Sequence, residues 1–204
     1  MPVLLADDKV WFDESTKVQQ ICTDVATAHL AGRSVLVLSH FEATLSQLSR
    51  VLREKGIGHE QFSSFNPVEL CANNAGLVWL GSARAFQVTN TMTPSAAGNG
   101  LEIICAEHHP MRSRDQQVID SAAKLVCDGH LCFHFSLDDP VMKYFGVGPI
   151  KALFEQLGMS KGECISHHLV TTAIRSAQEK IESKVGREMP THSVEDWFKY
   201  NLRK

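Results

Sequence analysis

The chain has 204 residues, of which 44% are hydrophobic and 21% charged, and its formal net charge is -3. This length is enough for one domain, or two small ones, with a well-buried core, and the composition is that of a globular protein rather than a disordered or fibrous one. Because 20 basic residues stand against 23 acidic ones, the chain has no global positive field, and we expect no nucleic-acid partner.

The sequence lacks the features of a membrane or secreted protein. No apolar stretch reaches the roughly 18 residues that a membrane span needs, and the first residues carry no basic and apolar signal region. The six cysteines are scattered without a CxxC pair, which favours reduced thiols. We therefore expect a cytoplasmic protein that does not insert directly into a membrane.

Hydrophobic periodicity predicts alternating helices and strands in the first half of the chain. In chain order the expected elements are helix 13–31, strand 34–39, helix 40–55, strand 57–63, helix 66–73 and strand 76–81. The run Val35-Leu36-Val37-Leu38 is uninterrupted and apolar, which is typical of a strand buried on both faces of a parallel sheet. This alternation indicates right-handed crossover units.

The second half begins with residues 83–100, whose Thr, Asn, Pro, Ser and Gly content indicates a surface loop, with a short edge strand over 86–88. The elements expected after it are strand 101–106, helix 111–125, strand 131–137 and helices 138–145, 149–157, 163–185 and 193–202. The long helix has an apolar stripe that recurs every four residues, at Ile165, Leu169, Ala173, Ala177, Ile181 and Val185. Such a stripe drifts around the helix, which predicts packing against more than one neighbour. The sequence thus predicts an α/β fold of five to six strands with a helical C-terminal extension.

Motifs for common site chemistries are missing or weak. No expected strand is followed by GxGxxG or GxxxxGK[ST], so we expect no cofactor and no tightly bound nucleotide. Gly81-Ser82-Ala83 lacks the GxSxG elbow of a serine nucleophile. His130, Cys132 and His134 alternate along one strand and would share a face, close enough for two of them to hold an ion. Without CxxC or HExxH spacing we expect no metal there, and a small metalloenzyme remains an alternative.

Several segments, in a fixed order, carry a family resemblance. Residues 32–37 read Gly-Arg-Ser-Val-Leu-Val, and residues 52–59 read Leu-Arg-Glu-Lys-Gly-Ile-Gly-His. The later matching residues are Gly100-Leu101, Glu107, His109, Arg112, Asp115, Gln117, Ser136 to Asp139, Met142, Phe145-Gly146, Leu157 to Met159, Ala173-Ile174, Ala177-Gln178 and Ile181-Glu182. Together they resemble the second nucleotide-binding domain of SecA, the ATPase motor of bacterial protein export. The resemblance implies a RecA-like three-layer αβα domain with a mainly parallel sheet over 1–160, and a helical extension packed on it over 161–204.

The nucleotide motifs of that family are not retained. The family motif Q-L-R-G-R-x-G-R-Q-G-D has arginines that reach the phosphates of ATP, and here Ile119, Ser121 and Lys124 stand in their places. The Gly-Arg-Gly core of T-N-M-A-G-R-G-T-D reads Ala85-Phe86-Gln87. An arginine finger contributes about 10³ to 10⁵ in rate, so the resemblance implies an ATPase site without useful turnover and no catalytic residue. The vestigial ATP-interface candidates are Arg112, Asp115, Gln117 and Lys124.

Three hypotheses follow from these observations. The leading one is a non-catalytic binding or regulatory module that has a protein partner linked to protein translocation. The alternative is a subunit that completes an ATPase in trans with a P-loop-bearing partner, for which Arg112, Arg114 and Lys124 would be the nearby cations. The third is the small metalloenzyme built on His130, Cys132 and His134.

Overall fold

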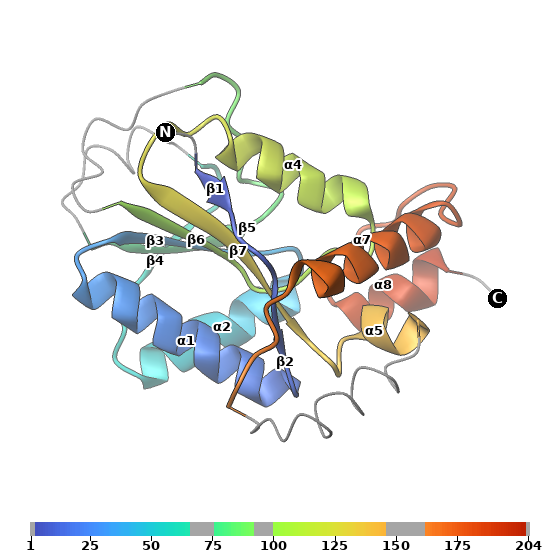
Figure 1. Ribbon diagram of the computed structural model, residues 1–204, viewed down its shortest axis with the longest axis horizontal. Coiled ribbons are helices and arrows are strands. Elements are labelled where there is room, and N and C mark those ends of the chain that lie inside the picture. The colour runs from blue at the N-terminus through green and yellow to red at the C-terminus, as the bar shows by residue number, and fades with distance from the viewer. Residues whose placement is uncertain (1–2, 66–75, 92–99, 146–161, 203–204) are drawn as a thin grey trace.

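The computed structural model describes residues 3–65, 76–91, 100–145 and 162–202. In these ranges seven strands form one sheet (Figure 1). They are β1 (Leu4–Leu5), β2 (Lys9–Trp11), β3 (Ser34–Ser39), β4 (Glu60–Phe62), β5 (Val78–Ser82), β6 (Leu101–Cys105) and β7 (Gly129–Ser136). Their order is β1-β7-β6-β3-β5-β4, β2 also pairs with β7, and each of these pairings is parallel. The predicted α/β fold with a parallel sheet is confirmed.

Helices cover both faces of this sheet and one of its ends (Figure 1). They are α1 (Glu14–Leu30), α2 (Glu42–Glu54), α4 (Arg112–Ala122), α5 (Pro140–Phe145), α7 (His168–Glu182) and α8 (Val194–Asn201). The helices α1 and α2 lie on one face and α4 on the other, whereas α5, α7 and α8 gather at the carboxyl end of the strands. The result is the three-layer arrangement with a helical extension that the sequence predicts.

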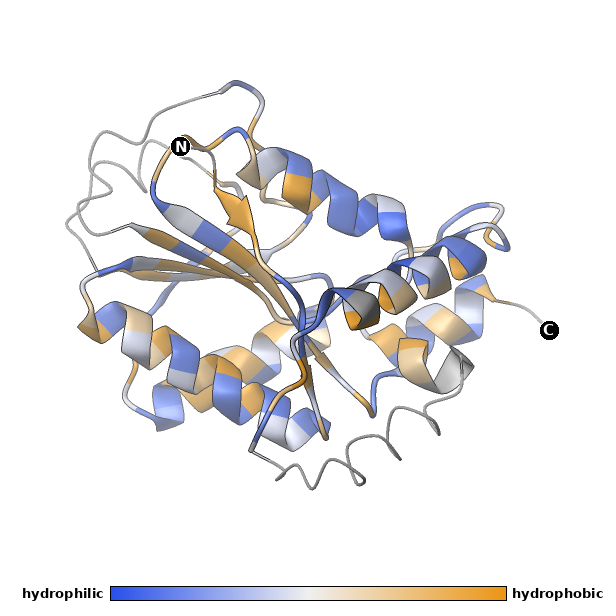
Figure 2. Ribbon diagram, viewed as in Figure 1, coloured by the Kyte–Doolittle hydropathy of each residue, from blue (hydrophilic) through white to orange (hydrophobic). Residues whose placement is uncertain are grey.

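The central strand β3 shows why its sequence carries no polar face. Val35 and Val37 pack into the cluster beneath α1 and α2, whereas Leu36 and Leu38 pack into the cluster on the α4 side. Successive side chains of a strand point to opposite faces, so a strand covered on both sides must be apolar throughout. Figure 2 shows the same pattern as apolar strands between helices of mixed character.

The edge of the sheet differs from the expectation. The two N-terminal strands β1 and β2 are not predicted, because runs of two and three residues are too short to establish an alternating pattern and Leu4 and Leu5 are exposed. The expected edge strand over 86–88 is wrong: the side chains of Phe86 and Val88 are buried, but their backbone forms no ladder. The expected helices over 66–73 and 149–157, and the domain boundary after residue 160, lie outside the described residues.

The long C-terminal helix begins later than predicted. Residues 163–167 are not helical. In this stretch, Ile165 exchanges two backbone hydrogen bonds with Val10, of 2.9 and 3.0 Å, in an antiparallel bridge. Within α7 the buried side chains include Thr171, Ile174 and Gln178, while Ala173 from the expected stripe is exposed. The helix contacts both α4 and α5, as the drift of the stripe predicts.

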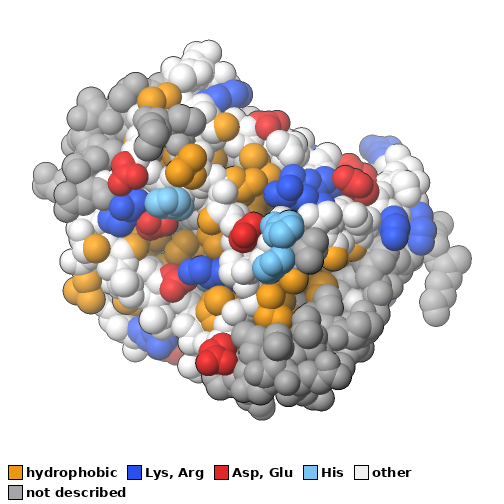
Figure 3. Space-filling view, in the orientation of Figure 1, with side chains coloured by type: hydrophobic (Ala, Val, Ile, Leu, Met, Phe, Trp, Pro, Cys, Tyr) orange, Lys and Arg blue, Asp and Glu red, His pale blue; other side chains and the backbone are white. Residues whose placement is uncertain are grey.

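Among the described residues, the helices include no membrane-spanning one, and the charges on the face seen in Figure 3 form no single charged patch. Within the described ranges, no helix combines the length and the apolar character that crossing a bilayer requires. On the face seen in Figure 3, basic and acidic side chains of the described residues lie side by side rather than in one large patch of a single sign.

Candidate functional site

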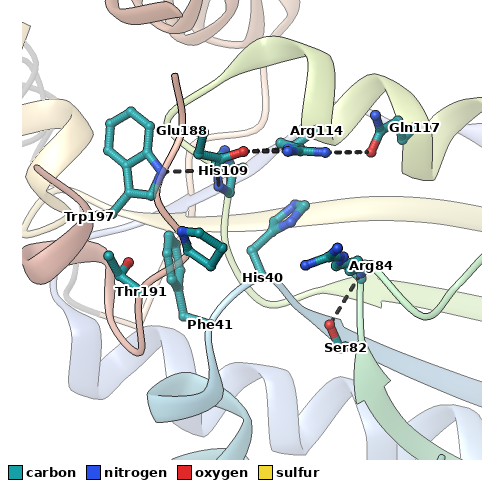
Figure 4. A pocket seen from close by; sticks show the side chains of 12 residues that line it. His40, Phe41, Ser82, Arg84, His109, Arg114, Gln117, Glu188, Thr191 and Trp197 are labelled. Carbon is teal, nitrogen blue, oxygen red and sulfur yellow. Dashed lines mark hydrogen bonds and ion pairs between the residues drawn. The ribbon is translucent and has the colours of Figure 1, made fainter. Parts of the chain in front are cut away.

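A cavity of about 130 Å³ opens at the carboxyl ends of β3 and β5 (Figure 4). Its walls come from the turns after these strands, from α4 and from the segment that joins α7 to α8. The lining residues include His40, Phe41, Ser82, Arg84, His109, Arg114, Gln117, Glu188, Thr191 and Trp197. In open parallel sheets, ligands bind at this edge, beyond the carboxyl ends of the strands.

The carboxylate of Glu188 is the most heavily contacted group of the cavity (Figure 4). Its Oε2 accepts hydrogen bonds from Nε of Arg114, at 2.9 Å, and from Nη2 of the same residue. Its Oε1 accepts from Nε1 of Trp197 and lies close to Nε2 of His109, both at 3.1 Å. The hydrogen bonds from His109, Arg114 and Trp197 outweigh burial and lower the pKa of Glu188 to about 2. The ionised carboxylate of Glu188 therefore lies inside the cavity.

The ring of His109 is held in one tautomer. Its Nδ1 accepts a hydrogen bond from the backbone N–H of Met111 at 3.0 Å, so the proton of the neutral ring is on Nε2 and points at Glu188. Burial lowers the pKa of His109, which favours this neutral form. The same ring stacks on Phe41, with 5.6 Å between ring centroids. His109 is thus a rigid, neutral donor to the anion.

Asp115 lies beneath the cavity and organises its floor. Oδ2 accepts hydrogen bonds from His108 and Gln178, and Oδ1 accepts from the backbone N–H of His109 at 3.0 Å. Nε2 of His40 lies 2.9 Å from Oδ1. Burial would raise the pKa of Asp115, but His108 and His40 hold it well below its usual range. The residue therefore ties α4 to the ends of β3 and β6 and to α7.

His108 lies between two buried carboxylates. Its Nδ1 is 2.6 Å from Oδ2 of Asp115, and its Nε2 is 3.3 Å from Oδ2 of Asp8. Burial alone would lower the pKa of His108, but the charges of Asp8 and Asp115 raise it to about 10. The ring is therefore a buried imidazolium that neutralises part of the acidic charge below the cavity.

Glu107 fixes the start of α2, the helix that leaves the cavity from β3. The N-cap residue of α2 is Phe41, whose side chain cannot accept a hydrogen bond from the helix. Instead, Oε1 of Glu107 accepts from the backbone N–H groups of His40 and Phe41 at 2.9 and 3.1 Å. The same carboxylate accepts from the hydroxyls of Ser39 and Thr44. A carboxylate at a helix N-terminus satisfies the free N–H groups and the helix dipole together.

The four ATP-interface candidates do not come together in the cavity. Gln117 lines it, whereas Asp115 is buried under it and saturated with donors. Arg112 donates along its own helix to Gln116 at 3.0 Å, and Lys124 donates from the turn after α4 to the backbone carbonyl of Val88 at 2.8 Å. The predicted set is therefore spread over α4 and the turn that follows it rather than assembled as one site.

Sequence reasoning missed three residues that shape the cavity: Arg84, Glu188 and Trp197. Arg84 follows the carboxyl end of β5 by two residues, and position at that edge of a parallel sheet is the signal that could have found it. Glu188 and Trp197 reach the cavity only because the chain turns back after α7, which no local pattern indicates.

The three residues weighed for a metal have separate partners. Nδ1 of His134 accepts from Nε1 of Trp11 at 3.1 Å, and burial lowers the pKa of His134 well below its usual value. Burial raises the pKa of Cys132 to about 12, so its sulfur is a thiol, and it contacts the carbonyl of Asp7 at 3.5 Å. His130 is exposed and lies 3.7 Å from Glu102. Ligation by His134 through Nε2 would require a proton on Nδ1, where Trp11 already donates.

Comparisons with known proteins find similarity to SecA. A family model described as the SecA P-loop domain matches residues 80–162. The protein translocase subunit SecA of Lachnoclostridium phytofermentans is 30% identical over 183 residues, which cover 86% of this chain and 21% of that protein. SecA of Clostridium botulinum (strain Eklund 17B / Type B) is also 30% identical, over 89% of this chain and 23% of that protein. The solved structure of the C-terminal part of the Fun30 ATPase domain covers 80% of this chain and 54% of that chain, with a TM-score of 0.47 and 14% identity.

The parallel sheet, its helical layers and the family match define the class of α/β P-loop domains. Within that class, the chain is similar in sequence to SecA over most of its own length. It spans about a fifth of the length of the curated relatives that it matches.

Proposed function

We propose that this chain is a SecA-related cytoplasmic module that binds a protein partner of the translocation machinery without hydrolysing ATP. The family match supports the link to translocation, because the similar proteins are named as protein translocase subunits. The absence of ATP turnover is the finer part of the proposal, and it depends on residues of α4 and of the turn that follows it.

The main support for the absence of ATP turnover is the set of contacts that Ser121 and Lys124 make. Both stand where the resembled motif has an arginine, and both contact one residue of the loop after β5. Oγ of Ser121 accepts from the backbone N–H of Val88 at 3.4 Å, and Nζ of Lys124 donates to the carbonyl oxygen of Val88 at 2.8 Å. Positions that would point arginines at phosphate are thus used to hold this loop against α4.

The third position supports the same conclusion. Ile119 is apolar and packs against the core cluster on the α4 side of the sheet. Phosphoryl transfer requires a charged, forked donor aimed at the phosphates, and neither an isoleucine side chain nor a hydroxyl supplies one. A lysine that is already hydrogen-bonded to the backbone offers one point charge at most.

A second candidate function is completion of an ATPase in trans, and Arg84 is the observation that favours it. This residue lines the cavity and is exposed at the carboxyl end of β5. Within the described part of the chain, its guanidinium forms no ion pair with a carboxylate, and its hydrogen bonds to Ser82 and Gln87 use the backbone. An arginine in this position can reach a phosphate group that a docked P-loop partner presents.

Steady-state phosphate release from ATP tests the proposal, first with the purified chain and then with a P-loop partner captured from the same cytoplasm. The proposal predicts no release by the chain alone and no change in the partner's rate. Release by the chain alone would contradict it. Stimulation that is lost in Arg84→Gln and kept in Arg53→Gln, an exposed arginine on α2, would establish the second candidate instead.

A further inference from the structure

We propose that the cavity at the ends of β3 and β5 is a binding site for a small oxyanion, of which inorganic phosphate is the simplest, and that Glu188 competes with this ligand for Arg114. The proposal goes beyond the proposed function, since it needs neither a protein partner nor any statement about ATP turnover. It concerns a site built by residues of this chain that the SecA resemblance does not include, above all Arg84, Arg114 and Glu188.

The charges around the cavity support an anionic ligand. Arg84 and Arg114 both line it, and Glu188 is the carboxylate among its lining residues. With His109 neutral, two guanidinium groups therefore face one carboxylate. Arg114 gives its Nε and Nη2 to Glu188, while its Nη1 makes only a long contact of 3.4 Å to Gln117. The guanidinium of Arg84 and the Nη1 group of Arg114 therefore remain available to a ligand. Guanidinium groups bind oxyanions through such pairs of N–H donors.

Glu188 itself shows that the cavity accepts an oxyanion. Its carboxylate receives hydrogen bonds from three different side chains, those of Arg114, Trp197 and His109, which come from two parts of the sequence. Trp197 is fully buried and His109 is 6% exposed, so two of these donors have fixed positions. An anion site preorganised in this way binds without further ordering of its side chains.

The size of the cavity selects the class of ligand. Its 130 Å³ correspond to about four waters at roughly 30 Å³ each, which is room for a single phosphate or carboxylate group. Pockets that enclose larger ligands measure about 300 to 1,000 Å³, so this cavity cannot enclose a whole nucleotide. The site is therefore assigned to a small oxyanion rather than to ATP.

The segment that carries Glu188 is anchored directly after this residue. The amide and carbonyl of Met189 bond to the side chain of Asn201 at 2.6 and 3.0 Å, and the carbonyl of His192 accepts from the backbone N–H of Ala43 at 3.1 Å. A ligand can therefore displace the Glu188 side chain while the segment stays in place. Removing the charge at this position should favour the external anion.

Titration calorimetry with inorganic phosphate tests the site, at constant ionic strength set with chloride. The wild-type chain is expected to bind phosphate, Glu188→Gln to bind it about tenfold more tightly, and Arg84→Gln about tenfold more weakly, as one charge-assisted contact is gained or lost. Arg53→Gln on α2 is the matched control, because it removes an exposed arginine away from the cavity, and it should bind like the wild type.

Two results would overturn the proposal. One is an absence of phosphate binding in both the wild type and Glu188→Gln, and the other is binding that Arg84→Gln leaves unchanged. Acetate in place of phosphate is a second probe, and acetate binding that depends on Arg84 supports the site equally. Circular dichroism checks the fold of each variant. If Glu188→Gln does not fold, the comparison of phosphate binding by the wild type and by Arg84→Gln, which lies on the exposed turn, still tests the site.

Discussion

The ammonium group of Lys124 donates a hydrogen bond to the backbone carbonyl of Val88, at 2.8 Å and across 36 residues of sequence. With Ser121 accepting from the amide of the same residue, it holds the loop after β5 against α4. A position where the resembled motif has an arginine thus contacts the backbone of this chain.

The contact predicts a local effect on stability. Lys124→Met should lower the free energy of unfolding by about 1 kcal/mol, because one hydrogen bond to a backbone carbonyl is lost. Urea denaturation measures this difference. Lys199→Met on α8 is the control, since Lys199 is exposed, and an equal loss in the two variants would argue against a role for the Val88 contact.

Asp115 predicts a larger effect on the same helix. Asp115→Asn removes the charge that faces His108 and His40 in a fully buried position, and breaking a buried ion pair costs about 3 to 5 kcal/mol. Asp120→Asn, one turn further and exposed, should change stability very little. Chemical denaturation of both variants provides the comparison, and similar stabilities would refute the central position of Asp115.

His108 predicts a dependence of stability on alkaline pH. Its pKa is about 10 in the folded chain against an ordinary value of 6.5, so the folded state binds this proton more tightly. Its contribution to stability is complete below pH 6.5 and is lost as the pH rises through 10. Unfolding free energies measured across this range should fall with pH in the wild type and less steeply in His108→Asn. Parallel profiles of the two chains would contradict the assignment.

At Asp139, in contrast, we expect a substitution to increase the stability of the fold. Burial raises the pKa of Asp139 to about 7 from an ordinary 3.8, although the charge of Lys17 lowers it. The folded state keeps this proton to higher pH than the unfolded state, so stability falls as the pH rises from 3.8 to 7. Asp139→Asn can still accept the hydrogen bond from the Val141 amide, which is 2.8 Å long.

The Asp139→Asn chain should therefore be more stable than the wild type at pH 8 and equally stable near pH 4. Thermal melting at the two pH values measures the difference. Asp138→Asn, the less buried neighbour, is the control and should show no such change with pH. A constant difference between Asp139→Asn and the wild type at both pH values would count against a raised pKa.

Much of the fold could be predicted because its signals are local. The apolar run of β3 matches the observed bounds Ser34–Ser39, and Gly32, at φ 72°, ends the first helix where the periodicity stops. The N-terminal strands and the late start of α7 could not be predicted in this way. They depend on pairing between distant segments, such as the bridge between Val10 and Ile165.

The site was harder to predict than the fold. The motif residues Glu107, His109 and Asp115 do lie together at the carboxyl edge of the sheet, but their roles there differ. Glu107 accepts from the backbone at the start of α2, Asp115 accepts from the backbone N–H of His109, and of these three only His109 lines the cavity. Glu188 and Trp197 enter through a chain reversal after α7, and a single sequence has no pattern that brings residues 188 and 109 together. Local motifs thus find the edge of the sheet, whereas tertiary packing decides which side chains face the cavity.

We propose that this SecA-related chain does not turn over ATP, and calorimetric titration with Mg·ATP, followed by an assay for released phosphate in the same sample, tests this proposal most directly. We expect ATP to bind no more tightly than inorganic phosphate and no ATP to be hydrolysed. Micromolar affinity for ATP together with continuous phosphate release would contradict it.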